Sequence, residues 1–241
     1  MTESESVQKL VRRQVRSPRS AALAGILFSL LIAASMILLR SGAIVDPAEI
    51  DTEWLEAGSA AASVVLVLVP FAGIAFLWFT GVMRDLLGDL EDKFFATVFL
   101  GSGIILVVMM YVWAAAYGAL FGTYQAVADA LADLDLFVYA TSFTNQIMAN
   151  YFLRMAGVYM LSTASLWTRT SAVPRWLSII TYIVALSFLL FAGVLRWARF
   201  IFPAWVLLVS VYILILNYRY TQELEVNEEP TVAVSYTHLT L

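Results

Sequence analysis

Residues 136–168 read LFVYATSFTNQIMANYFLRMAGVYMLSTASLWT, a stretch long enough to cross a bilayer that nevertheless carries polar side chains in its middle. The polar residues are Asn145, Gln146, Asn150 and Arg154. An ionisable side chain at membrane depth is costly, so it marks either a site or a polar seam inside a helix bundle. We therefore interpret this stretch as a transmembrane helix that the rest of the chain must cover.

The composition is that of a multi-pass helical membrane protein. Hydrophobic residues make up 61% of the chain and charged residues only 13%, whereas soluble domains have about 45–50% and about 25%. The apolar residues fall in blocks of roughly twenty, the length that crosses about 30 Å of hydrocarbon. The sequence predicts an all-α fold, a polytopic membrane helix bundle with six transmembrane helices. The spans are expected at 21–39, 59–83, 94–120, 136–168, 176–195 and 200–216.

The charged segments predict how the chain is oriented. A basic N-terminal segment (1–20) precedes the six-helix membrane domain (21–218), and an acidic tail (219–232) follows it. If the N-terminus lies inside, the inner segments carry ten Lys and Arg residues and the outer ones three. This bias favours both termini in the cytoplasm. The excess of Arg over Lys indicates a GC-rich bacterial genome, so we expect a location in the bacterial plasma (inner) membrane.

Four tryptophans are expected near the two membrane surfaces. Trp167 and Trp176 fall on the predicted inner side, and Trp113 and Trp197 fall on the predicted outer side. Tryptophan is enriched at membrane–water interfaces, where its ring is half in lipid. The spacing therefore predicts an aromatic belt.

The last residues, AVSYTHLTL at 233–241, look foreign to the rest of the chain. The DNA that encodes such a peptide resembles the transposon end that attaches adapters in sequencing libraries. We interpret the segment as adapter read-through that is not native, and we leave it out of the fold prediction. On this interpretation His238, the single histidine of the chain, is not native.

The residue inventory excludes several kinds of chemistry. The chain has no cysteine, which excludes disulfides, thiolate metal sites and cysteine nucleophiles. Without a native histidine, the usual ligands of zinc and haem are missing, as is a Ser-His-Asp site. We therefore expect no catalytic residues, no metal and no cofactor. Nucleic acid is not expected as a partner, because no basic patch lies beyond the N-terminus.

The polar residues of 136–168 share one face of the predicted helix. At 100° per residue, Gln146, Asn150 and Arg154 lie on successive turns. The same sector holds Tyr139, Gly157, Leu161 and Ala164. Because lipid cannot satisfy hydrogen-bond donors, we expect this face to point into the bundle.

Two interpretations of this face stay open. In the first it is a packing clasp, in which Arg154 bonds carbonyl groups freed near Pro70 or the hydroxyls of Ser102 or Tyr111. In the second it is a ligand site, with Arg154 as the charge and Asn150 and Gln146 as orienting donors. Guanidinium is a natural partner of phosphate and carboxylate, so the ligand would be an anionic lipid or a small anion.

Two segments carry a family resemblance. EDKFFATVFLGSG at 91–103 and VPRWLSII at 173–180 resemble parts of uncharacterised six-helix bacterial integral membrane proteins. The resemblance implies a shared fold and no particular activity.

We therefore expect a non-enzymatic membrane protein whose first partner is the lipid bilayer, with a polar seam on the fourth span. One alternative is a small transporter, or a protein that binds anionic lipid or a small anion through Arg154. Another is a lipid-modifying membrane enzyme that works through its carboxylates. A homo-oligomer is compatible with the sequence but not indicated by it.

Overall fold

All the regular structure that the computed structural model describes is helical. The described residues are 3–40, 52–87, 93–126, 134–170, 173–194 and 197–233. The helices are α1 (Glu3–Arg40), α2 (Thr52–Leu87), α3 (Lys93–Ala126), α4 (Leu134–Gln146), η4 (Ile147–Phe152), α5 (Leu153–Thr170), α6 (Arg175–Phe191) and α7 (Ala198–Ala233). The segment η4 is a π-helix, and α4, η4 and α5 follow one another without a break as the α4–α5 rod. The residues after Ala233, where we predict adapter read-through, lie outside the described part.

Among the residues that the structure describes, four helices are long and apolar enough to cross a membrane. They are Arg19–Leu39, Glu53–Arg84, Ala96–Thr123 and Ala198–Arg219. These helices confirm the prediction of a helical membrane protein. The count of six spans and the cytoplasmic position of both termini stay predictions.

Two helices have other bounds than the predicted spans. The fifth span, expected at 176–195, ends as a helix at Phe191, and Gly193 follows with a positive φ of 87°. A residue with positive φ cannot continue an α-helix, and glycine adopts that backbone conformation without strain. Helix α2 begins at Thr52, before the predicted start of the second span at 59. Glu53 in its first turn favours the earlier start, because a carboxylate there interacts well with the helix dipole.

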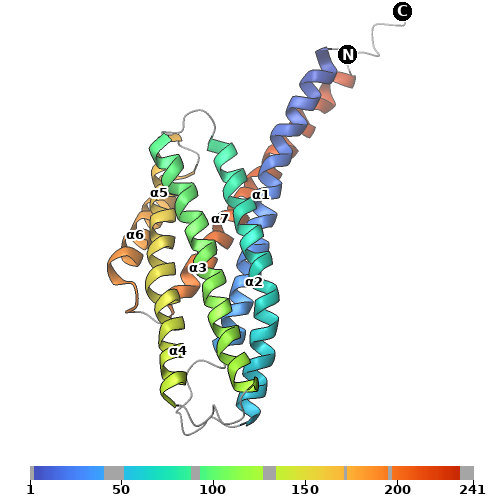
Figure 1. Ribbon diagram of the computed structural model, residues 1–241. Coiled ribbons are helices and arrows are strands. Elements are labelled where there is room, and N and C mark those ends of the chain that lie inside the picture. Colours follow the sequence, from blue (N-terminus) through green and yellow to red (C-terminus); the bar gives the residue numbers. More distant parts are fainter. Residues whose placement is uncertain are drawn as a thin grey trace, which may run out of the picture.

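The helices pack as an antiparallel bundle (Figure 1). Helix α1 contacts α2 and α7, α2 contacts α3, α3 contacts α5, and α5 contacts α6. We call proximal the end at which α2 leads to α3 and α5 leads to α6. The other end, at which α3 leads to α4, is called distal and is the end predicted to face outward. Helices α1 and α7 both run on past the proximal end (Figure 1).

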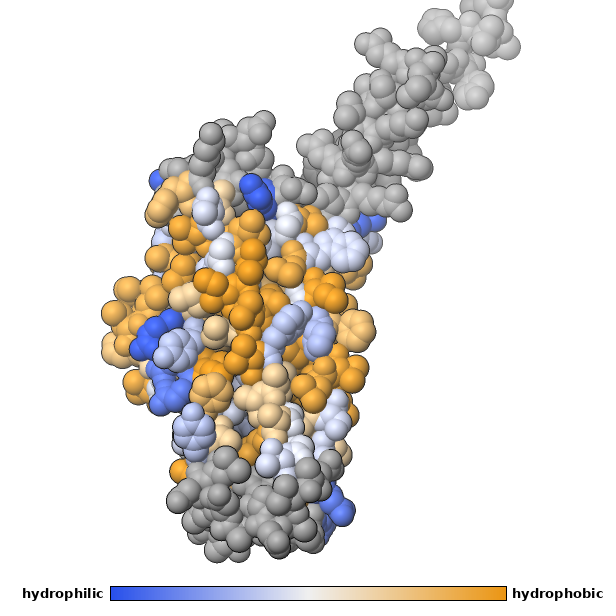
Figure 2. All heavy atoms as spheres, in the orientation of Figure 1, coloured by the Kyte–Doolittle hydropathy of each residue, from blue (hydrophilic) through white to orange (hydrophobic). Residues whose placement is uncertain are grey.

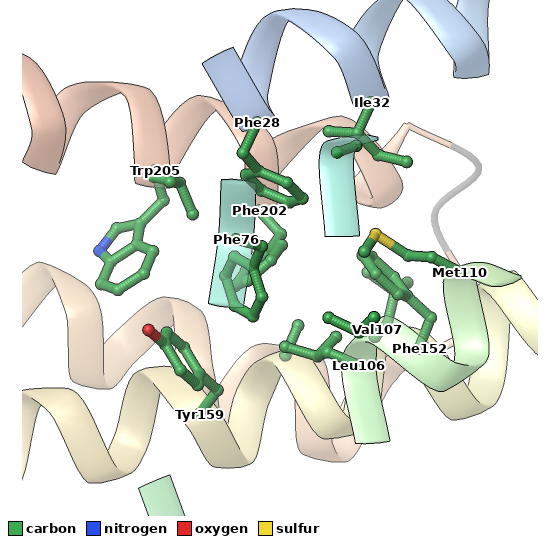
Figure 3. Packing of buried hydrophobic residues seen from close by; sticks show 14 of the residues in the cluster. Phe28, Ile32, Phe76, Leu106, Val107, Met110, Phe152, Tyr159, Phe202 and Trp205 are labelled. Carbon is green, nitrogen blue, oxygen red and sulfur yellow. The ribbon is translucent and has the colours of Figure 1, made fainter. Parts of the chain in front are cut away.

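Aromatic rings from five helices form the centre of the bundle (Figure 3). Tyr159 of α5 stacks on Phe99 of α3 at 4.6 Å between ring centroids and lies 5.1 Å from Phe76 of α2. Phe28 of α1 and Phe202 of α7 complete the group, with centroids 4.8 and 5.8 Å from that of Phe76. Such ring pairs contribute about 0.5–1.5 kcal/mol each beyond area burial. This core fixes how α5 sits against the other helices.

The structure corrects part of the predicted aromatic belt. Trp176 and Trp197 are 55% and 58% exposed, as belt residues would be. Trp167 and Trp113 are each only 2% exposed. Trp167 packs on Trp205, with 5.9 Å between ring centroids, and Trp113 packs on Tyr117 at 5.8 Å. These two rings therefore belong to the interior of the bundle, because neighbouring aromatic side chains cover them.

Candidate functional site

The predicted polar face changes from buried to exposed along the α4–α5 rod. Gly157 and Ala164 are buried, Asn150 and Arg154 are half-buried, and Gln146 is exposed. At Gly157 the rod touches α6 so closely that an added Cβ would lie 2.9 Å from the carbonyl oxygen of Ala185. The face therefore packs on α6 at its proximal end and emerges towards the distal end. The prediction that it points into the bundle is right only for the proximal part.

Gln146, Asn150 and Arg154 form a hydrogen-bonded series that we call the polar ladder. Nη1 of Arg154 donates to the backbone oxygen of Asn150 at 3.3 Å and to its side-chain Oδ1 at 3.1 Å. Nδ2 of Asn150 then donates to Oε1 of Gln146. Each bond joins residues four apart on the same rod, so the ladder is built along one helix and does not bridge two.

The π-helix η4 lies inside the ladder. It buries Ile147, Met148 and Phe152 against the bundle, whereas Tyr151 is 60% exposed. π-helical turns within α-helices are rare and often occur at functional sites. Here the turn contains Asn150, the middle residue of the ladder. The sequence offers no local signal that predicts it.

The α6–α7 turn forms a second wall beside the ladder. A Cβ added to Gly193 would lie 3.0 Å from Oδ1 of Asn150, and the φ of Gly193 is +87°. Two independent restrictions therefore favour glycine, namely the backbone conformation and the space above Asn150. A single glycine near the end of an apolar run is a typical helix-stop signal. The sequence can therefore indicate a helix end at Gly193, but it cannot indicate that Gly193 lies beside Asn150.

The guanidinium of Arg154 keeps unused donors. Both hydrogen bonds that the Arg154 side chain makes to described residues come from Nη1. Within the described residues, no acceptor for Nε or Nη2 and no carboxylate partner is found. The sequence between 136 and 222 holds six arginines and no Asp or Glu. The segment 136–222, which carries the ladder, therefore supplies positive charge without any carboxylate of its own.

The groups that a clasp was expected to use are bonded elsewhere. The hydroxyl of Tyr111 donates to the carbonyl oxygen of Pro70 at 3.2 Å. The hydroxyl of Ser102 donates to the carbonyl oxygen of Phe99 at 3.0 Å. Asn145, which precedes the ladder by one residue, is half-buried and stands about 100° away around the helix. The structure thus brings Gln146, Asn150 and Arg154 together and leaves Asn145 apart.

The surface around the middle of the α4–α5 rod is distinct from the rest of the flank. Figure 2 shows a hydrophilic patch there, surrounded by apolar surface. With Gln146 exposed and Asn150 and Arg154 half-buried, the ladder is accessible to lipid or solvent beside the bundle.

In the part of the chain that the structure describes, no group of three or more His, Asp or Glu residues is arranged to hold a metal ion. Comparison of the chain with protein-family models, with curated proteins and with solved structures finds no match. The resemblance carried by 91–103 and 173–180 stays a prediction.

Proposed function

We propose that this protein binds a small anionic group of the phosphate type, from a lipid headgroup or free in solution, through the polar ladder. The observation that carries the proposal is the bonding of Arg154. Its side chain is half-buried on the α4–α5 rod, yet within the described residues both of its hydrogen bonds to protein go to Asn150 of the same rod. Two hydrogen bonds from one nitrogen leave the other guanidinium donors without a protein acceptor among the described residues, and a donor that is partly removed from water is stabilised by an external acceptor.

The direction of the hydrogen bonds supports an acceptor as the ligand. Arg154 donates to Asn150, and Asn150 donates to the oxygen of Gln146. The ladder uses its acceptor oxygens internally, so the groups left over are donors, namely Nε and Nη2 of Arg154 and the amide nitrogen of Gln146. A lipid phosphodiester has only acceptor oxygens at neutral pH and inorganic phosphate has mainly acceptor oxygens, and guanidinium binds either with two parallel bonds.

The proposal is limited to binding by a non-enzymatic membrane protein. Transport needs two alternating arrangements of the helices, and the single arrangement seen here carries no argument for it. A lipid-modifying enzyme would need an acid–base group beside the ligand, and the sequence near the ladder holds no Asp, Glu or His.

Thermal unfolding in a neutral detergent tests the proposal. Wild type, Arg154→Met, Arg154→Lys and Arg175→Met are compared with added phosphatidylglycerol, phosphatidylcholine or inorganic phosphate. A ligand at 100 times its Kd stabilises by about 2.7 kcal/mol, which raises Tm by about 5–10 °C for a protein of this size. We expect that shift in wild type with phosphatidylglycerol or phosphate, its loss in Arg154→Met, and a smaller shift in Arg154→Lys because lysine binds as a point charge.

Arg175 is the matched control because it is an exposed arginine at the other end of the bundle. Arg175→Met removes the same charge and should keep the full shift. An equal shift in Arg154→Met and wild type would refute the proposal.

A further inference from the structure

Two classes of apolar stretch divide the bundle. The stretches Arg19–Leu39, α6 and Ala198–Arg219 contain 21, 17 and 22 residues. At 1.5 Å per residue they measure about 26–33 Å, close to the roughly 30 Å of bilayer hydrocarbon. The apolar stretches of α2 and α3, Glu53–Arg84 and Ala96–Thr123, contain 32 and 28 residues, so they measure about 48 and 42 Å. They exceed a bilayer by about 12–18 Å. The α4–α5 rod is about 55 Å long.

The excess length lies at the distal end. Figure 1 shows the proximal ends of α2, α3, α5 and α6 at one level, whereas α2, α3 and α4 continue well past the α6–α7 turn on the distal side. On the proximal side, Nε of Arg19 donates to Oδ1 of Asn217 at 2.7 Å, which ties α1 to α7 there. The apolar stretches of bilayer length therefore mark the membrane, and α2, α3 and the α4–α5 rod extend through it and beyond.

Asn150 lies at the distal boundary of this membrane layer. From Thr170, where α5 ends, it is about 30 Å along the rod, one hydrocarbon thickness away. The close approach of Gly193 places the α6–α7 turn at the same level. Trp197, 58% exposed, follows in this turn, as expected of a residue at a membrane surface. The ladder is thus at the edge of the hydrocarbon and not in its middle.

The distal segments of α2 and α3 are less hydrophobic than the segments that follow or precede them in the membrane layer, as expected of helix segments outside the lipid. Residues 52–63 of α2 read TEWLEAGSAAAS, whereas 64–79 read VVLVLVPFAGIAFLWF. In α3, 96–113 include most of the large aliphatic side chains and 114–126 read AAAYGALFGTYQA. Figure 2 shows the strongly apolar surface giving way to paler residues towards the distal end.

Packed side chains hold the distal segments of α2, α3 and α4 together. The ring of Trp54 in α2 lies 5.5 Å from that of Phe121 in α3 and 5.7 Å from that of Phe137 in α4. Phe137 and Leu120 form a small buried cluster, and Trp54 packs both on this cluster and on the main core, to which Phe121 belongs. Three helices can therefore stay packed without lipid around them.

We infer that α2, α3 and α4 extend past the distal leaflet as a three-helix cap, and that the ladder at its base binds the phosphate of a lipid in that leaflet. The side chain of Arg154 supports this placement, because it reaches distally along the rod to Asn150. Arginine near a membrane surface extends its charged end to the headgroups in this way. The lipid part of the inference rests on the proposed function, whereas the cap does not.

Cysteine labelling tests the cap, since the chain has no cysteine of its own. Tyr139→Cys places a thiol on α4 in the cap, and Ile183→Cys places one on α6 within the membrane layer. These side chains are similarly exposed on the protein, at 69% and 64%. The labelling is done in nanodiscs, which leave both faces accessible. We expect a membrane-impermeant maleimide to label Tyr139→Cys at least ten times faster than Ile183→Cys, after each rate is corrected for the rate of the same variant in denaturant. Equal rates would overturn the cap.

A second arm identifies the source of the phosphate. Wild type is unfolded thermally in nanodiscs of a phosphate-free neutral glycolipid with and without inorganic phosphate, and in nanodiscs of the same glycolipid mixed with phosphatidylglycerol, because phosphatidylcholine carries a phosphodiester of its own. The inference expects a rise in Tm with phosphatidylglycerol and none with free phosphate. An equal rise with free phosphate would overturn the lipid assignment and leave the proposed function standing. If neither raises Tm, the proposed function and the lipid assignment both fail, and the labelling result still decides the cap.

Discussion

Tyr159 and Arg154 stand five residues apart on α5 and use their polar groups in opposite ways. Tyr159 is fully buried, and its hydroxyl is hydrogen-bonded at 3.0 Å to the hydroxyl of Thr80 on α2. Arg154 is half-buried, and among the described residues it bonds to Asn150 on its own rod and to no other helix. A polar group that holds helices together has its partner on another helix. By that criterion Tyr159 is a packing residue, and Arg154 is available to a ligand.

The largest effect is expected from removing the packing residue. Tyr159→Ala deletes a ring that contacts aromatic side chains of several helices, and such deletions cost about 3–5 kcal/mol. For a protein of this size, we expect Tm to fall by at least about 6 °C. Thermal unfolding in detergent measures it.

Tyr151→Ala is the matched control, because this tyrosine lies on the same rod but is 60% exposed. It should lower Tm by no more than about a third as much. If the two variants lose equal stability, the aromatic centre around Tyr159 does not govern the packing of the bundle.

A smaller effect is expected where α5 and α6 meet. Gly157 lies between Arg154 and Tyr159, and an added Cβ would lie 2.9 Å from the backbone oxygen of Ala185. Backbone cannot move aside as a side chain can, so Gly157→Leu should push α6 away at a cost of about 1–3 kcal/mol. Because α6 leads into the turn beside Asn150, the anion-dependent rise in Tm should shrink as well.

Gly101→Leu provides the comparison for this variant, since a Cβ there meets no atom within 4 Å. It should leave both Tm and the anion-dependent rise unchanged. A Gly157→Leu variant that lost stability but kept the full rise would show that the ladder does not depend on α6.

Hydropathy and helical periodicity predicted the helical membrane class and the common face of Gln146, Asn150 and Arg154. Both are local properties, fixed by the spacing of residues along one helix. Depth is not local, so the prediction that Arg154 lies in mid-span stays a prediction, whereas the inferred cap places it at the edge of the hydrocarbon. The run 136–168 is apolar enough to be read as one span, although Phe137 in its first part packs on Trp54 of α2. The end of α6 at Phe191 is the observation from which we infer the distal edge of the membrane layer.

The smallest effect is expected from Arg154→Met in neutral detergent without any anion. The variant loses two hydrogen bonds within one helix, and polar contacts in membrane proteins average only about 0.6 kcal/mol. It also removes a charge that has no carboxylate partner among the described residues, so Tm should change by less than about 3 °C.

Comparing Arg154→Lys with Arg154→Met distinguishes a packing clasp from a ligand site. If Arg154 were a clasp, lysine would keep part of the bonding and methionine would lose it, so their Tm values would differ clearly even without anion. If Arg154 serves a ligand, both variants should unfold close to wild type without anion and diverge only when phosphatidylglycerol is added. A loss in Arg154→Met as large as that in Tyr159→Ala would place both residues in the packing of the bundle and remove the distinction between them.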